Sequence, residues 1–246
     1  MRKPMIAAAV ALSFSAGANA SVVDFGDGGV ALQGVFDSIS TDGSNDVKVA
    51  TDGLSDDVDS AWAIGATGGS VSTMVIELAD YKGTNSFGIY DLNDHTNSVE
   101  LFGGANVAGD QVLLSILADG SVKINLTDTL TDLGSLGNFG YYLGVAATGN
   151  TYYSDSSLNG DGFDHMAAYE GIGEELQIDP YAAGPWGSNE YILAWEDLHV
   201  GGDKDFTDFV VMVESVSPVP VPEPASVALL GLGLVGLGFA RRAKKA

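Results

Sequence analysis

The feature of this sequence that most limits its fold is a repeated alternation of apolar and polar residues with a period of two. Short segments of this kind recur along the chain, separated by turns rich in Gly, Asp and Asn. Segments 112–117 and 122–126 flank Asp119-Gly120, which predicts a hairpin because Gly adopts a positive φ without steric cost. The pattern predicts an all-β fold, an antiparallel β-sandwich or jelly-roll-like single domain.

The same pattern predicts further strands, at 30–39, 47–50, 62–64, 71–78, 87–90, 99–102, 141–146, 191–195 and 209–216. Residues 54–61 are expected to form one short helix. No linker-like stretch interrupts residues 21–217, and apolar residues are interleaved throughout this range. We therefore expect 21–217 to form one β-sandwich domain with a single sizeable core.

Charge is distributed very unevenly along the chain. Residues 21–220 hold four lysines, no arginine and 32 of the 33 acidic residues, a net charge of −28. Such a surface repels nucleic acids and anionic lipids, and it attracts divalent cations and basic partners. Cys is absent, which excludes disulfides, thiol chemistry and Cys-ligated zinc.

The N-terminal end has the pattern of a secretory signal peptide. Arg2 and Lys3 precede an apolar stretch over 5–16, and Ala18-Asn19-Ala20 supplies an A-x-A cleavage site. We expect residues 1–20 to direct the chain to the secretion translocon and to be removed by signal peptidase. The mature protein should then begin near Ser21.

The C-terminal end has three parts. Residues 218–224 form a Pro-rich linker that contains Pro222-Glu223-Pro224, residues 225–240 are apolar, and residues 241–246 are basic, beginning with Arg241 and Arg242. The prolines should keep the linker extended, and the basic residues should stay on the cytoplasmic side of a membrane.

The apolar run of the tail is short for a membrane span. Its 16 residues would span about 24 Å as a helix, against about 30 Å of hydrocarbon, which leaves a buried core helix as the alternative. We favour a transmembrane helix because the run has no polar face and because Arg241 and Arg242 can snorkel to the interface.

The three-part tail resembles the PEP-CTERM sorting signal, the tag that exosortase recognises in Gram-negative bacteria that make extracellular polysaccharide. This resemblance implies exosortase as a partner, a transient anchor in the inner membrane, and a final location at the cell surface or outside the cell. Cleavage is expected at or next to Pro222-Glu223-Pro224.

A second resemblance covers nearly the whole mature region. It is carried by segments 32–39, 87–91, 99–103, 164–169, 194–198 and 201–208, in that order. Together they resemble an uncharacterised β-rich family of exported bacterial proteins that often ends in a PEP-CTERM tag. The resemblance implies a secreted surface or matrix domain and no established enzyme.

Acidic residues concentrate just before the last predicted strand. Asp203, Asp205 and Asp208 follow two glycines, and Glu196 and Asp197 could add two more carboxylates. Hard oxygen ligands in a Gly-bent loop are what Ca²⁺ prefers, so we predict a calcium site here. The alternative is a structural turn in which Asp205 and Asp208 cap backbone donors.

A second acidic segment partly follows the EF-hand pattern. Asp155, Asn159, Asp161 and Asp164 lie close together, but the bidentate Glu that ends an EF-hand loop is missing. A looser Ca²⁺ loop and a solvated turn are the alternatives. His95, His165 and His199 are scattered and are expected to be isolated loop histidines.

These patterns favour a non-enzymatic surface or biofilm-matrix protein. A Ca²⁺-dependent module that binds carbohydrate or extracellular polysaccharide is the first alternative, in which Trp62, Trp186 and Trp195 would stack on sugars or else lie in the core. A secreted polysaccharide hydrolase is the second alternative, because a pair of catalytic carboxylates among the 32 acidic residues would leave no motif in the sequence.

Overall fold

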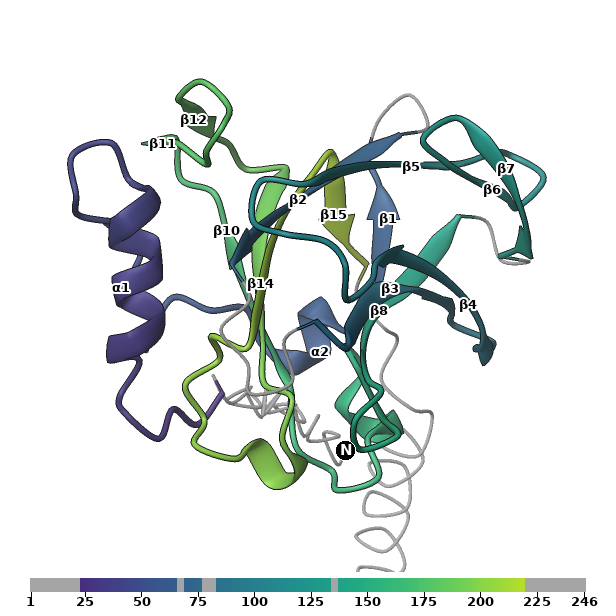
Figure 1. The fold of residues 1–246 in the computed structure, drawn as a ribbon, viewed down its shortest axis with the longest axis horizontal. Coiled ribbons are helices and arrows are strands. Elements are labelled where there is room, and N and C mark those ends of the chain that lie inside the picture. The colour runs from purple at the N-terminus through teal and green to yellow at the C-terminus, as the bar shows by residue number, and fades with distance from the viewer. Residues whose placement is uncertain (1–22, 66–68, 77–82, 134–136, 220–246) are drawn as a thin grey trace, which may run out of the picture.

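The computed structural model describes residues 23–65, 69–76, 83–133 and 137–219, and these form two large antiparallel sheets packed face to face (Figure 1). The expected signal peptide and the sorting tail lie outside the described residues. In the part of the chain that is described, no helix is long and apolar enough to cross a membrane. The predicted antiparallel β-sandwich is confirmed.

The first sheet has six strands in the order β15-β1-β8-β3-β4, and β9 pairs with β8. Its strand β15 pairs with β1, and the backbone N–H of Val219 then donates to the carbonyl of Ala61. The end of the described chain is thus tied to its first strand. The strands are β1 (Trp62–Ile64), β3 (Asn85–Asp91), β4 (Asp94–Phe102), β8 (Asn138–Val145), β9 (Asn150–Tyr153) and β15 (Val216–Pro218).

The second sheet has seven strands in the order β10-β13-β14-β2-β5-β6-β7. Its β5–β6 hairpin turns at Asp119-Gly120 as predicted, with Gly120 at a φ of 90°. These strands are β2 (Ser70–Ile76), β5 (Gln111–Ile116), β6 (Ser121–Ile124), β7 (Thr127–Asp132), β10 (Met166–Glu170), β13 (Glu190–Trp195) and β14 (Phe209–Glu214).

Strand β13 shows why the second sheet is buried on both faces. Tyr191, Leu193 and Trp195 point into the core between the sheets. Ile192 and Ala194 point to the opposite face, into a second core beneath a helix. Because side chains alternate between faces, a strand covered on both sides reads as a continuous apolar run.

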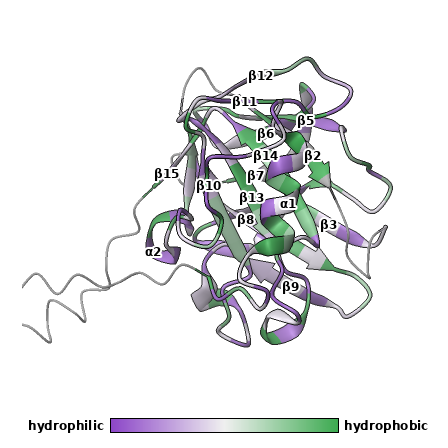
Figure 2. Cartoon of the chain, turned by 90° about the vertical axis from the view of Figure 1, so that its left-hand side faces the viewer, coloured by the Kyte–Doolittle hydropathy of each residue, from purple (hydrophilic) through white to green (hydrophobic). Residues whose placement is uncertain are grey.

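The helix that covers the outer face is α1 (Val30–Ile39), and the prediction of a strand at 30–39 is wrong (Figure 2). Its buried residues are Leu32, Val35, Phe36 and Ile39, which recur at helical spacing. Both oxygens of Asp27 accept backbone N–H groups at the start of the helix. Loop residues 47–50, also predicted as a strand, form bends and turns that pack Val47 and Val49 against this helix.

The remaining elements are short. The helix expected within 54–61 is α2 (Asp56–Asp59), and two 3₁₀ helices, η1 (Ser156–Leu158) and η2 (His199–Gly201), lie in loops. Strands β11 (Glu174–Leu176) and β12 (Gly184–Trp186) form a separate two-stranded ribbon, anchored by the fully buried Trp186.

Candidate metal centre

The loop that joins β13 to β14 gathers the predicted calcium ligands. Backbone φ is positive at Val200, Gly201, Gly202, Lys204 and Phe206, so the chain turns repeatedly within a few residues. The Phe206 ring is buried and lies 5.0 Å from the ring of Phe25, which fixes the loop to the body of the domain.

Two overlapping groups of carboxylates result from this turn. Oxygens of Glu196, Asp203 and Asp205 lie within 4.8 Å of one another, and so do oxygens of Glu196, Asp197 and Asp208. Glu196 belongs to both groups. The structure therefore brings together all five residues that the sequence placed in this site.

Glu196 is the most constrained member of the cluster. Its side chain is completely buried, and among the described residues neither carboxylate oxygen has a hydrogen-bond partner. Burial, followed by the charge of Asp208, raises the pKa of Glu196 well above its ordinary value. Burial also raises the pKa of Asp208. Two ionised carboxylates side by side repel each other, and neither can donate a hydrogen bond to the other. A shared proton or a shared cation would remove this repulsion.

The other acids already make hydrogen bonds that stabilise the loop. Asp205 Oδ1 accepts the N–H and hydroxyl of Thr207, and Asp208 Oδ2 accepts the N–H of Asp197 at 2.9 Å. Asp197 Oδ2 accepts from the Asn85 side-chain amide, whose own Oδ1 is buried without a partner. The capping contacts of the structural alternative are present, and they do not reach the Glu196 carboxylate.

The one lysine of the loop does not neutralise these acids. Lys204 Nζ donates to Asp24 at 2.8 Å and lies 5.4 Å from the centre of the Phe163 ring. Gly202, in contrast, borders the cluster directly. A Cβ at this position would lie 2.6 Å from the Leu198 Cβ and 3.0 Å from a Glu196 oxygen.

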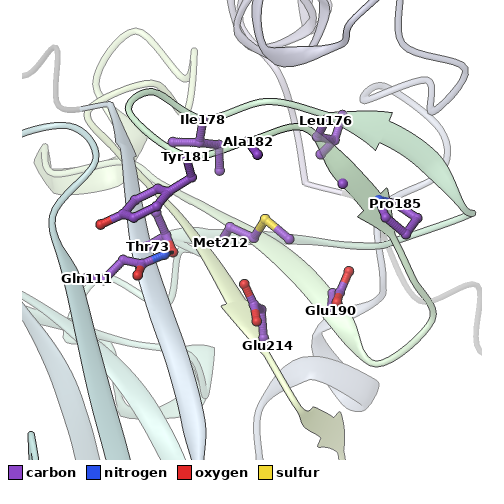
Figure 3. A pocket seen from close by; sticks show the side chains of 11 residues that line it. Thr73, Gln111, Leu176, Ile178, Tyr181, Ala182, Pro185, Glu190, Met212 and Glu214 are labelled. Atoms are coloured by element: carbon purple, nitrogen blue, oxygen red, sulfur yellow. Dashed lines mark hydrogen bonds between the residues drawn. The ribbon is translucent and has the colours of Figure 1, made fainter.

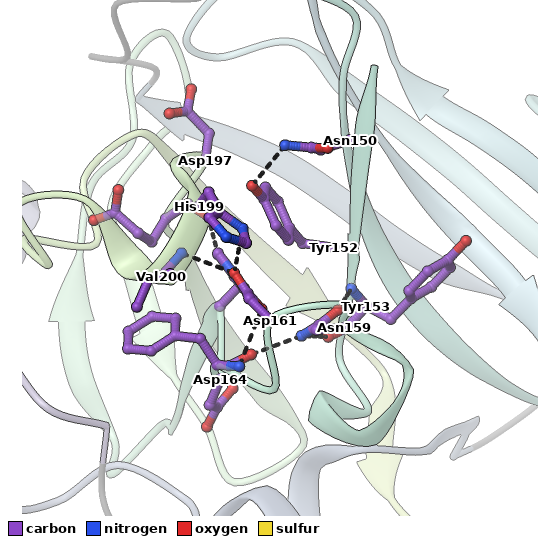
Figure 4. A network of polar contacts seen from close by, with 12 residues as sticks. Asn150, Tyr152, Tyr153, Asn159, Asp161, Asp164, Asp197, His199 and Val200 are labelled. Carbon is purple, nitrogen blue, oxygen red and sulfur yellow. Dashed lines mark hydrogen bonds and ion pairs between the residues drawn. The ribbon is translucent and has the colours of Figure 1, made fainter. Parts of the chain in front are cut away.

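A histidine fixes the backbone of Glu196. His165 Nδ1 donates to the Glu196 carbonyl at 2.8 Å, and Nε2 lies 3.0 Å from Asp161 Oδ2. The imidazole is buried and stacks on Tyr152 at 3.6 Å between ring centres. Asp161 also accepts the N–H of Val200 (Figure 4). One carboxylate therefore holds both His165 and the loop.

The prediction of isolated loop histidines is therefore wrong, because His165 and His199 are not isolated and His95 is not in a loop. His199 Nδ1 lies 3.2 Å from the same Asp161 oxygen that binds His165. His95 lies in β4, with its ring 5.1 Å from the ring of Tyr153. Asp161 is only four positions before His165. Sequence spacing could not reveal the contacts of His199 with Asp161 and of His95 with Tyr153, because each joins segments far apart in the sequence.

The second predicted acidic site does not form one group of ligands. Asp155 accepts from Ser157, and Asn159 binds the backbone of Tyr153 and Phe163. Asp161 is the partner of His165, and Asp164 accepts the N–H of Met166. Among the described residues, clusters of three or more His, Cys, Asp or Glu close enough to share a metal occur only around Glu196.

A buried acid at the end of α2 gave no sequence signal. Asp59 is buried, and neither of its carboxylate oxygens has a hydrogen-bond partner among the described residues. Burial, followed by the charge of Asp164, raises the pKa of Asp59, and burial raises that of Asp164 to about 7. Asp59 differs from Glu196 because, among the described residues, it belongs to no group of three or more ligand atoms close enough to share a metal, although the charges of Asp164, Asp56 and Asp57 also act on it.

The three tryptophans belong to the core. Trp62, Trp186 and Trp195 are each completely buried. They are therefore unavailable for stacking on a sugar, and their alternative role as core residues holds.

Comparison with known families agrees with the two resemblances. Residues 220–244 match the PEP-CTERM protein-sorting motif, and residues 107–216 match a domain of unknown function, DUF4114. The chain thus has the predicted PEP-CTERM tag, and the DUF4114 match covers somewhat less than half of the chain. It is therefore an exported protein with exosortase as its processing partner. No curated protein matches the chain.

The sorting residues fall inside the matched tag. Pro222, Glu223, Pro224, Arg241 and Arg242 lie within residues 220–244 and outside the described residues. The signal-cleavage residues Ala18, Ala20 and Ser21 also lie outside the described residues.

The DUF4114 match contains the whole acidic loop but only part of the sandwich. Strand β14, inside the match, pairs with β2, outside it. Strand β8 likewise pairs with β3. The core between the sheets draws on residues from both parts, including Trp62 and Trp195. The matched segment therefore needs the preceding strands to complete its hydrophobic core.

Proposed function

We propose that this protein is a non-enzymatic surface or biofilm-matrix protein, delivered by the exosortase route, whose sandwich binds Ca²⁺ in the loop between β13 and β14. The observation that carries the proposal is the Glu196 carboxylate. It is fully buried beside four further acids, and neither of its oxygens has a hydrogen-bond partner in the described part of the chain. Leaving a buried charge uncompensated is costly, and a cation of matching chemistry would remove that cost.

The donor set favours calcium over softer metals. The cluster offers only carboxylate oxygens from five residues, with the Asn85 amide oxygen nearby. Ca²⁺ takes six to eight oxygen ligands in flexible geometry, whereas zinc and copper prefer nitrogen or sulfur.

Calcium binding is tested by thermal unfolding of the purified mature protein in EDTA and in millimolar CaCl₂. A ligand that binds only the folded state stabilises it by about 2.7 kcal/mol at 100-fold excess over Kd. The midpoint should rise by several degrees, and NaCl of equal ionic strength should not reproduce this rise. The double variant Asp203→Asn/Asp205→Asn should lose most of it.

Glu175→Gln is the control, since Glu175 is exposed on β11 in the separate two-stranded ribbon. It removes one negative charge and should keep the full calcium response. If the midpoint is the same with and without Ca²⁺, or if the double variant keeps the response, the loop is a structural turn and the calcium proposal fails.

Processing is tested by mass spectrometry of the protein recovered outside the cell. We expect the segment from Ala225 onward to be missing, because Pro222-Glu223-Pro224 precedes the apolar part of the tag. Deleting residues 241–245 should reduce membrane retention and processing, since the stop-transfer charge is removed. Recovery of the intact tail from the surface fraction would contradict the proposed release.

A further inference from the structure

A second acidic feature lies at the opposite end of β13 and β14. Glu190 begins β13, Glu214 ends β14, and the two residues are direct partners in the antiparallel pair. Together with the β11–β12 ribbon they line a pocket of about 230 Å³ (Figure 3). The calcium proposal uses neither residue.

The pocket combines an aliphatic wall with two carboxylates and the polar side chains of Thr73 and Gln111. Leu176, Ile178, Pro185 and Met212 supply aliphatic surface, and the Tyr181 ring, itself 39% exposed, lies at one side. Figure 3 shows both glutamate side chains pointing toward the same space as these residues. An aliphatic chain could lie along this wall with a polar end at the glutamates.

The charge at this end of the pocket is unbalanced. The Cβ atoms of directly opposite residues in an antiparallel pair lie about 4.5–5.5 Å apart, so like charges on such residues repel each other. None of the eleven lining residues is Lys, Arg or His. Of the described lysines, Lys123 pairs with Asp128 and Lys204 with Asp24, while Lys48 donates to the Asn45 carbonyl. A positive group from another molecule would be attracted to this place.

We propose that this pocket binds a primary ammonium group on an aliphatic stem, namely a lysine side chain of a basic partner protein. The ammonium would lie between Glu190 and Glu214, and its methylene stem would pack on Met212 and Tyr181. A cation near an aromatic face gains further attraction. Salt-bridge formation would neutralise two acids that otherwise repel each other.

Size and polarity favour a lysine over a saccharide. Pockets for larger ligands measure about 300–1,000 Å³, so 230 Å³ suits a single side chain. Sugar hydroxyls need several polar partners along their length. Besides the glutamates the lining offers Tyr181 and the pair Thr73 and Gln111, and Gln111 Nε2 already donates to Thr73 Oγ1 at 3.0 Å. A polymethylene stem needs no polar partners. A partner with basic side chains is also the one that a surface of net charge −28 attracts at a distance.

The test is an NMR titration of the mature protein with Nα-acetyl-lysine N-methylamide, run in saturating CaCl₂ so that the acidic loop is occupied. We expect saturable shifts confined to the pocket residues. The norleucine analogue has the same stem without the charge, and it should bind at least fivefold more weakly. Glucosamine presents the ammonium on a polar ring, and we expect it to bind more weakly than the lysine probe.

Variants then assign the binding to the two acids. Glu214→Gln and Glu190→Gln should each weaken lysine binding at least fivefold. The control Glu100→Gln, on an exposed position of β4 in the other sheet, should bind as the wild type does. Glu214→Gln removes a repulsion and is expected to fold, which its circular dichroism and thermal midpoint would verify.

Three results would overturn the proposal. The first is the absence of saturable shifts, and the second is equal binding of lysine and norleucine probes. The third is tighter binding of glucosamine, which would assign the pocket to an amino-bearing polysaccharide. None of them would bear on calcium binding at Glu196, which is measured with a different ligand and different variants.

Discussion

The two ends of the β13–β14 pair carry the same chemistry in different surroundings. At one end, Glu196 is fully buried among Asp197, Asp203, Asp205 and Asp208, and its oxygens have no donor. At the other end, Glu190 and Glu214 are partly exposed and border an open pocket. The ends are about 20 Å apart along strands of six residues.

Burial decides what each end can bind. Water screens carboxylates that are partly exposed, so repulsion between Glu190 and Glu214 is modest and a weakly bound, exchangeable cation suffices. Water does not reach Glu196, so its charge must be removed by a proton or matched by a tightly held cation. The same residue type thus favours reversible recognition at one end and a structural ion at the other.

Removing one carboxylate from each end should affect calcium binding at only one of them. Glu196→Gln should abolish the stabilisation by calcium, about 2.7 kcal/mol at 100-fold excess over Kd. Glu214→Gln should leave that stabilisation unchanged. Urea unfolding of both variants with CaCl₂ and with EDTA measures the difference.

The EDTA measurement separates a ligand from a purely structural residue. Without metal, Glu196→Gln should be at least as stable as the wild type, because it replaces a buried acid that lacks any donor. A variant that is equally destabilised with and without calcium would show that Glu196 acts through packing alone.

A Gly→Ala substitution at each end tests how closely the atoms around the added methyl group are packed. Gly202→Ala should destabilise the domain by about 1–3 kcal/mol, because its backbone conformation strongly favours Gly. Its φ is 47° and ψ is −119°, and the added Cβ would approach Leu198 and Glu196. Gly184, which lines the pocket, has nothing within 4 Å of an added Cβ. Gly184→Ala should therefore change stability by less than about 0.5 kcal/mol.

The smallest expected effect is the pH dependence at the open end. Burial, followed by the charge of Glu190, raises the pKa of Glu214 above its ordinary value of 4.5. The folded protein therefore binds this proton more tightly than the unfolded chain does. Stability is lost as the pH rises from about 4.5 through the higher pKa of the folded state.

Glu214→Gln should remove this loss. It should stabilise the protein by about 0.2–1 kcal/mol at pH 8, where both glutamates are ionised, and by much less near pH 4. Unfolding curves at the two pH values measure the change, with Glu100→Gln as the control. A gain of equal size at both pH values would mean that charge repulsion is not its cause.

The sequence predicted the strands well where one face alternates cleanly or where a turn is marked, as at Asp119-Gly120. The prediction failed at 30–39. Leu32, Val35, Phe36 and Ile39 have helical spacing, but this segment is also rich in the β-branched and aromatic residues that are typical of strands. Only the packing of α1 against the outer face of the second sheet decides between the two.

The two acidic ends differ in how far they could be predicted from the sequence. The loop cluster could be predicted because Glu196, Asp203, Asp205 and Asp208 are close in sequence, and because Glu196 directly continues an apolar strand. Glu190 and Glu214 are 24 positions apart and meet only through strand register. Asp59 and Asp164 are farther apart still, and their proximity depends on how α2 packs.

The pairing of β15 with β1 limits how far the folded body can stand from its sorting tag. The last described residue, Val219, is still hydrogen-bonded to Ala61, and Pro222 follows three positions later. Three residues reach at most about 11 Å when fully extended. Cleavage at Pro222-Glu223-Pro224 would thus occur almost in contact with the domain, and exosortase would have to accommodate a finished sandwich at the mouth of its active site.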